Sequence, residues 1–251
     1  GSLIWNSEKI EKQISPEIVK CGDYIFVYEN AYDENSCIMY SFNADDGTLN
    51  QTIDLGTHNY PTGPIVPYKN RYLIWSFWGK TEENERYSYV CLFDTNDIEN
   101  PTVKLSEVVN GVISTDLLLE ENENGDIVYF ETMGFKYNGW HPKIGAIECE
   151  SLKVKWIREI EESYWPCGDN SLLIEGNRLF AMDSGLVCLN KTDGSVIYVN
   201  LNEDFYSPDY SGSIIRGESE NTEGMFYYDE KIFLTNTAGG RADDRYFKNI
   251  Q

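Results

Sequence analysis

The sequence repeats a pair of hairpins about every 50 residues, and this repeat restricts the fold more than any other feature. Residues 185–200, GLVCLNKTDGSVIYVN, hold two apolar runs joined by a polar turn, and Asp-Gly tolerates the positive dihedrals of a tight hairpin. The same arrangement recurs at 36–56, 89–105 and 143–160. Further hairpins alternate with these, with turns near residues 22, 70, 125, 176 and 229. Two hairpins per period make a four-stranded unit, which is typical of a β-propeller blade.

The number of these units predicts the size of the ring. Five units fit into the chain, so we expect one all-β domain over residues 1–251, a five-bladed β-propeller of four-stranded antiparallel blades. The opening SLIWNSEKI has the pattern of an outer strand without the three strands that should precede it. We therefore expect this N-terminal strand, residues 3–9, to pair with the last blade and close the ring, because pairing covers two open sheet edges.

One position of the repeat always carries a small residue between apolar neighbours. When the turns are aligned, Ser41, Cys91, Ala146 and Cys188 fall at this place. Free cysteine behaves as a small hydrophobe, so we expect Cys91 and Cys188 to be buried thiols outside any disulfide. The chain has six cysteines and no C-x-x-C motif, which argues against a structural zinc site and favours free, mostly buried thiols.

The repeat resembles that of a known superfamily. LVCLNKTDGSVIYVN, YSFNADDGTLNQTIDL and the opening LIWNSEKI are similar to the repeat of quinoprotein-like propellers (the PQQ-type repeat), in which the outer strand bears a tryptophan. The resemblance implies that Trp5, Trp156 and Tyr198 are the outer-strand aromatics. The redox members of that superfamily use about eight blades, a vicinal Cys-Cys pair and a calcium site. This sequence has fewer repeats and no adjacent cysteines, so we expect a small member without the redox site and without a cofactor.

The charge of the chain restricts its partners. Asp and Glu number 42 and Lys and Arg number 20, which gives a net charge of −22. Such a surface repels nucleic acid and anionic membranes and attracts a basic protein, although the same acidity could serve only to keep the protein soluble. No apolar run reaches the roughly 18 residues of a membrane span, and no signal peptide opens the sequence. We therefore favour the cytoplasm, with secretion or export to the periplasm as the alternative if a leader was removed.

Candidate site residues gather in the loops that a propeller presents at one face. These loops contain both histidines and many aromatic side chains, which offer large contact area with a polar edge. The alternative is that loop aromatics only pack the ends of the blades. Two histidines alone make a poor metal site, and we expect neither a metal site nor catalytic residues. The predicted ligand-binding or partner-binding residues are His58, Tyr60, Trp78, Trp140, His141, Trp165, Asp209, Tyr210 and Arg241.

Two function classes remain open from the sequence. The first is a non-enzymatic binding propeller, monomeric by itself, whose loop face grips a basic protein partner; one concrete form is an immunity protein that inhibits a basic toxin. The second is a carbohydrate-binding lectin or a five-bladed glycoside hydrolase, which needs paired carboxylates. Asp116, Asp169 and Asp209 lie near the starts of predicted inner strands, where such carboxylates could be mounted.

Overall fold

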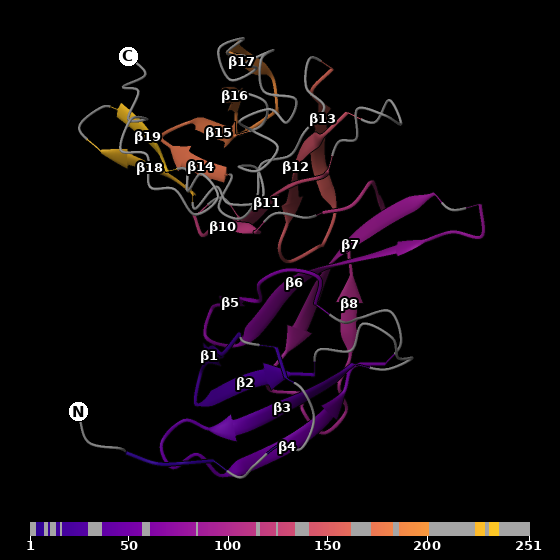
Figure 1. Ribbon diagram of the computed structural model, residues 1–251, viewed down its shortest axis with the longest axis vertical. Helices are drawn as coiled ribbons and strands as arrows, with labels where there is room; N and C mark the ends of the chain where they lie inside the picture. Colours follow the sequence, from indigo (N-terminus) through magenta and orange to yellow (C-terminus); the bar gives the residue numbers. More distant parts are fainter. Residues whose placement is uncertain are drawn as a thin grey trace, which may run out of the picture. The chain divides into compact units, whose positions relative to one another are not determined.

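The computed structural model describes most of the first 200 residues and two strands beyond them. The described residues are 4–7, 10, 14–15, 17–29, 37–56, 61–83, 85–113, 116–123, 125–133, 141–161, 172–182, 186–200, 224–228 and 231–235. The chain divides into two units, residues 1–110 and 111–251, which are taken one at a time below. In the described part every regular element is a β-strand (Figure 1), and none of it forms a helix long and apolar enough to span a membrane.

The first sheet of unit 1 is a four-stranded antiparallel meander. It contains β1 (Val19–Cys21), β2 (Tyr24–Tyr28), β3 (Ile38–Asn43) and β4 (Leu49–Asp54), in that order. Gly22 has a φ of 57° in the turn between β1 and β2, a conformation that glycine adopts without strain. The two predicted hairpins of the first repeat therefore form one sheet.

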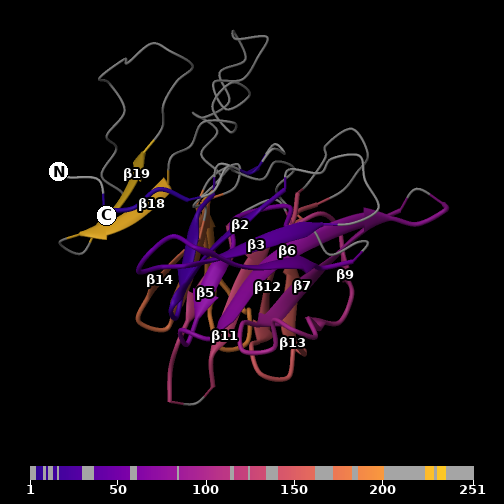
Figure 2. The same cartoon turned by 90° about the horizontal axis from the view of Figure 1, so that it is seen from below.

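The second sheet of unit 1 has an additional strand. It contains β5 (Val66–Tyr68), β6 (Tyr72–Lys80), β7 (Arg86–Asp94) and β8 (Val103–Leu105), and β9 (Val109–Asn110) pairs with the far end of β7. β6 and β7 have nine residues each, whereas β2 has five. The β6–β7 hairpin is therefore long, and it extends beyond the other strands of its unit (Figures 1 and 2).

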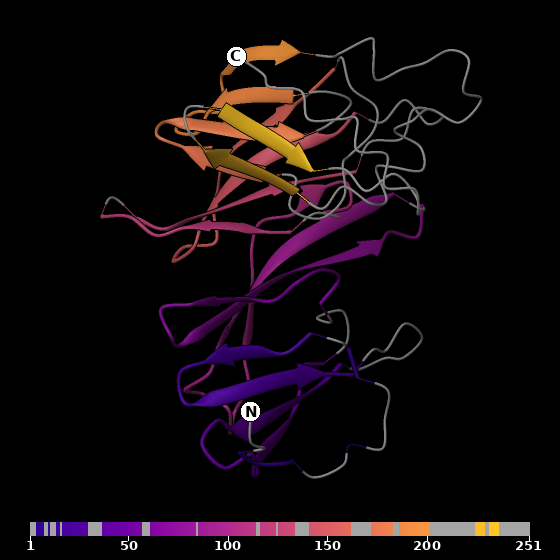
Figure 3. The same ribbon diagram turned by 60° about the vertical axis from the view of Figure 1, so that its left-hand side comes forward.

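Unit 2 contains two further four-stranded meanders and one hairpin. The strands of the first are β10 (Leu118–Glu120), β11 (Ile127–Glu131), β12 (Lys143–Glu148) and β13 (Val154–Glu159). Those of the second are β14 (Leu172–Glu175), β15 (Arg178–Met182), β16 (Leu186–Asn190) and β17 (Val196–Asn200). β18 (Gly224–Tyr228) and β19 (Lys231–Thr235) pair with each other, and β18 lies next to β14 (Figure 3).

The small-residue position of the repeat is buried in all four complete sheets. The position lies in the third strand of each sheet, and its four residues have no exposed surface: Ser41, Cys91, Ala146 and Cys188. The residue opposite each of them on the second strand is aromatic: Phe26, Trp75, Tyr129 and Phe180, in the same order. A large ring on one strand leaves room only for a small side chain on the next, because protein interiors are close-packed. The sequence showed the small residue but not the ring that requires it.

The prediction of buried, free thiols is confirmed for the described cysteines. Cys21, Cys37, Cys91, Cys149 and Cys188 are all buried and unpaired in disulfides, whereas Cys167 lies outside the described residues. Burial raises the pKa of the Cys37 thiol to about 12 and also raises the pKa of Cys91 and Cys188. These thiols are therefore protonated at neutral pH and poorly reactive.

An Asp-Gly turn in unit 2 supports the outer-strand tryptophan of the preceding sheet. Trp156 in β13 donates its indole Nε1–H to the carbonyl oxygen of Lys191 at 3.0 Å. Its ring lies against Gly194, whose φ is 69° and where an added Cβ would overlap the ring. Arg158, two residues on, donates from Nε to the carbonyl of Gly194 at 3.0 Å. The turn between β16 and β17 thus closes a hairpin and also holds the neighbouring strand.

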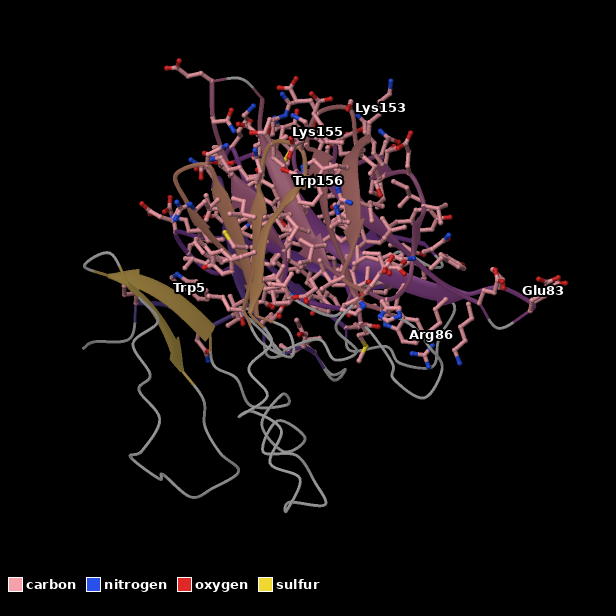
Figure 4. The ribbon with its side chains drawn as sticks, turned by 90° about the horizontal axis from the view of Figure 1, so that it is seen from above. Trp5, Glu83, Arg86, Lys153, Lys155 and Trp156 are labelled. Atoms are coloured by element: carbon pink, nitrogen blue, oxygen red, sulfur yellow. The ribbon has the colours of Figure 1, made fainter. Side chains whose placement is uncertain are left out.

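Unit 1 contains the same contact. Trp5 donates its indole Nε1–H to the carbonyl of Ala44 at 3.1 Å, and its ring lies against Gly47, which has a φ of 73° (Figure 4). Ala44 and Gly47 belong to the turn between β3 and β4, which corresponds in sequence to the turn of Lys191 and Gly194. Trp5 and Trp156 therefore make equivalent contacts with their turns, although Trp156 lies in an outer strand and Trp5 lies in no strand.

Ring closure and blade count stay predictions. Ile4–Ser7 belong to no strand, and the remaining residues of the expected N-terminal strand, 3, 8 and 9, lie outside the described part. The fifth upstream hairpin is present as β18–β19, but the rest of the fifth unit also lies outside it. The all-β fold and the antiparallel four-stranded sheets are confirmed, and the single-domain assignment of residues 1–251 remains an expectation.

Candidate functional site

Two of the nine predicted site residues fall within the described part of the chain. Trp78 lies in β6, and His141 lies two residues before β12. The other seven lie outside the described residues: His58, Tyr60, Trp140, Trp165, Asp209, Tyr210 and Arg241. Trp78 and His141 belong to different units, so each is considered with its own sheet.

Trp78 is part of a strand, which corrects the sequence prediction that it lies in a loop. β6 continues to Lys80 and β7 begins at Arg86, so only five residues connect the two strands. Trp78 faces Ser88 across the hairpin, and Lys80 faces Arg86. The aromatic-rich stretches on both sides of the turn favour extended backbone, and β9 adds pairing at Ser88, so the strands extend further than in the first sheet.

One face of the hairpin carries an aromatic–cation pair. The guanidinium carbon of Arg86 lies 5.6 Å from the centre of the Trp78 ring. Strand alternation and the Lys80–Arg86 register place Lys80 on this same face. A cation above an indole ring gains about 0.5–1 kcal/mol at an exposed site. The pair therefore holds a half-buried tryptophan ring in a defined orientation on a projecting element.

The opposite face of the hairpin is also aromatic. Gly79 faces Tyr87 across the hairpin, and an added Cβ at Gly79 would lie 2.6 Å from the Tyr87 hydroxyl oxygen. Tyr87 packs edge-on against Tyr89, with ring centres 5.5 Å apart. The Tyr87 side chain covers the glycine, a pattern that stabilises a strand where glycine would otherwise weaken it. Both faces of the hairpin thus present aromatic rings held by neighbouring groups.

The tip of the hairpin is acidic and exposed. Thr81 closes the turn by donating its backbone N–H to the carbonyl of Glu85 at 2.8 Å, and Glu85 donates its N–H to the Thr81 hydroxyl at 3.1 Å. Glu82, Glu83 and Glu85 are exposed, and Glu83 lies at the outer end of the hairpin, beyond Arg86 (Figure 4). Three exposed carboxylates therefore lie at the tip of the hairpin.

An ion pair fixes the base of the hairpin. Arg71 donates from Nε at 3.0 Å and from Nη2 at 2.6 Å to the carboxylate of Asp94, the residue that ends β7. The hydrogen bonds from Arg71 hold the pKa of Asp94 below its ordinary value. Bidentate geometry of this kind favours one arrangement of the two strands.

His141 and Asp116 are the other described residues that the sequence analysis considered for a site. His141 is half-buried just before β12, and Asp116 lies two residues before β10, as the strand prediction required. Among the described residues, no group of three or more His, Cys, Asp or Glu side chains is arranged to hold a metal ion. The β6–β7 hairpin is therefore the candidate functional site within the described part of the chain.

Sequence reasoning identified Trp78 but missed Arg86 and Lys80 as parts of the same surface. The signal was present in the sequence, because WGK and RYS flank the turn at equal spacing and pair when the turn closes. The sequence prediction places this stretch in a loop, and loop residues have no register.

Of the comparisons with known proteins, only the one with solved structures found similar proteins. No protein-family model matches the sequence, and no curated protein matches it either. Among solved structures, the Dos1 propeller is similar with a TM-score of 0.52 and 10% identity, over 87% of this chain and 55% of that chain. BamB from Moraxella catarrhalis is similar with a TM-score of 0.44 and 11% identity, over 93% of this chain and 72% of that chain. This chain thus spans little more than half the length of the Dos1 propeller chain, and its likeness to that structure shows that its fold is of the β-propeller type.

Proposed function

We propose that this protein is a non-enzymatic binding propeller that grips a protein partner, and that the β6–β7 hairpin is one of its contact elements. The observation that carries the proposal is the Trp78–Arg86 pair on a hairpin that extends beyond its sheet. Aromatic and arginine side chains supply a large part of the binding energy at protein interfaces. A ring held by its neighbour loses little conformational entropy on binding, which favours affinity.

The charge of the molecule supports a basic partner. The net charge is −22, and the hairpin adds three exposed carboxylates at its tip. An acidic surface speeds the encounter with a cationic protein, most strongly at low salt. An immunity protein that inhibits a basic toxin is one concrete form of this function. The remaining predicted residues, such as Trp140 and Tyr210 in unit 2, stay candidate contacts that lie outside the described part.

Affinity purification with matched variants tests the proposal. The wild-type protein is used to recover a partner from the source cells, and the recovered protein is then purified and titrated against each variant. Trp78→Ala is expected to weaken binding by roughly 30-fold or more, because a central aromatic anchor contributes about 2 kcal/mol. Leu105→Ala serves as the control, since Leu105 is an exposed apolar residue of the same sheet, 44% exposed and outside the hairpin.

Two results would contradict the proposal. The first is that no protein is recovered in a stoichiometric complex while a glycan array gives specific binding, which would favour the carbohydrate-binding alternative. The second is that Trp78→Ala and Leu105→Ala bind the recovered partner equally well. In that case the hairpin is not a contact element.

A further inference from the structure

Among the described residues, no strand lies beside the outer part of one edge of the β6–β7 hairpin. β5 pairs with β6 only through Val66–Tyr68, which lie opposite Ile74–Tyr72. Thr62 extends this contact by one step, since its backbone N–H and its hydroxyl donate to the carbonyl of Ser76 at 2.9 and 2.8 Å. Beyond Ser76, no described residue pairs with β6 on this side.

The backbone groups of Trp78 and Lys80 point to this open edge. In an antiparallel ladder the N–H and C=O of one residue point to the same neighbour, and successive residues alternate. The Ser76 carbonyl points toward Thr62, away from β7. Trp78 and Lys80 lie two and four residues further on, so their N–H and C=O groups share that direction. The open edge therefore offers two donors and two acceptors in the spacing of a strand.

The charge around the edge selects what can pair with it. An exposed edge invites another strand, and natural proteins limit this with charged side chains. A second copy of this protein would bring a second net charge of −22 to an edge that already lies next to the exposed Glu82, Glu83 and Glu85. Two molecules of like charge repel each other, whereas a basic strand is attracted to the acidic tip, with an uncharged side chain of that strand beside Lys80. The Trp78 ring, held by Arg86, adds an apolar platform for a side chain of that strand.

We propose that an extended, basic segment of the partner adds as a strand to the open edge of β6, pairing with the backbone of Trp78 and Lys80. Strand addition takes its affinity from main-chain hydrogen bonds and its selectivity from the side chains beside the edge. This inference rests on the proposed function, because it specifies how the protein partner is bound. It differs in that the backbone of the hairpin, and not only its side chains, makes the contact.

A defined peptide serves as the probe. It has ten residues, alternates lysine with threonine or valine, and is blocked at both ends; its counterpart carries glutamate in place of lysine. We expect saturable binding of the basic peptide, weakened by salt, and an exchange rate of the Trp78 and Lys80 amide hydrogens at least tenfold slower in the complex. The acidic peptide should leave exchange unchanged. If the basic peptide binds while both amides exchange at the unbound rate, or if it does not bind at all, the proposal is wrong.

A pair of variants at one position separates backbone from side-chain contact. Lys80→Pro removes an N–H that points to the open side, and proline is compatible with an edge strand at such a position. Lys80→Ala removes the same charge but keeps the N–H. We expect Lys80→Pro to weaken peptide binding at least tenfold and Lys80→Ala to change it less than threefold. Equal loss in the two variants would assign the contact to the lysine side chain and overturn strand addition.

The unaltered protein provides a second test that does not depend on the proline variant folding. Two versions of the basic peptide carry N-methyl groups on alternate residues, in opposite phase. Methylation blocks the peptide edge that faces β6 in only one of them, so one version should lose binding and the other should keep it. Equal binding of the two versions overturns the proposal. So does sedimentation showing that the purified protein dimerises and that Lys80→Pro abolishes the dimer, because the occupant would then be a second copy.

The tests also distinguish this inference from the function on which it rests. If Trp78→Ala weakens binding of the recovered partner but Lys80→Pro leaves it unchanged, the binding function stands and strand addition fails. If neither variant affects that partner, the proposed contact element fails as well.

Discussion

Trp156 and Trp78 are both half-buried tryptophans on strands, yet their surroundings differ completely. Trp156 donates a hydrogen bond to the Lys191 carbonyl and lies against Gly194, so its ring is enclosed by the neighbouring sheet's turn. Trp78 lies beneath Arg86 on a hairpin that extends into solvent. The two rings are thus buried to a similar degree, but different groups contact them, and these contacts decide the role of each ring. The first ring holds two sheets together, whereas we propose that the second contacts a partner.

The largest expected effect follows from filling the space beneath the Trp156 ring. Gly194→Ala places a Cβ where the ring lies and imposes a positive φ on alanine, so we expect the free energy of unfolding to fall by about 3 kcal/mol. Urea denaturation measures this change. Gly176→Ala is the matched control, because Gly176 has a φ of 56° and nothing within 4 Å of the added Cβ. It should cost about 1 kcal/mol, from the backbone alone. Equal losses would show that the ring contact at Gly194 does not matter.

The next effect compares the two tryptophans directly. Trp156→Phe removes the indole N–H and part of the packed surface, so unfolding should become easier by about 2 kcal/mol. Trp78→Phe keeps an aromatic face beneath Arg86 and should cost about 0.5 kcal/mol or less. Thermal and urea unfolding of the two variants measure the difference. A larger loss for Trp78→Phe would reverse the roles that we assign to the two rings.

Trp5 provides an intermediate case that sharpens the comparison. It makes the same contacts as Trp156, but the residues around it, Ile4–Ser7, belong to no strand. We expect Trp5→Phe to lower the free energy of unfolding of unit 1 by about 1 kcal/mol, mainly through the lost hydrogen bond to Ala44. Deletion of residues 1–10 should destabilise the protein more if the N-terminal strand closes the ring. Equal values for the deletion and for Trp5→Phe would leave ring closure without support.

The smallest effect on stability is expected at the hairpin tip. Replacing Glu82, Glu83 and Glu85 by glutamine should change the free energy of unfolding by less than about 0.5 kcal/mol, because the three side chains are exposed. The same variant should associate more slowly with a basic partner, most visibly at low salt, and dissociate at nearly the same rate. Stopped-flow association at two salt concentrations measures this. A change in dissociation without a change in association would indicate direct contact and not steering.

Much of the architecture could be predicted because it repeats. The alternation of apolar residues, a polar turn and the small residue at the third strand recur from unit to unit, so several repeats support the same assignment. The buried position of Cys91 and Cys188 followed from this alignment and is confirmed. The candidate site was less predictable, because it lies in the segment where the second sheet departs from the repeat.

The sequence by itself determined the class of fold, the strand order within each sheet and the residues that turn the chain, since these depend on local alternation and on the backbone freedom of Gly47 and Gly194. Tertiary structure decided the rest. Only the pairing register of the strands showed that an aromatic ring faces each small third-strand residue, and that Trp78 and Arg86 belong to one face of an extended hairpin. The physical reason is that periodicity is a property of neighbours along the chain. The role of a ring depends on the atoms that surround it, and residues far away in the sequence supply them.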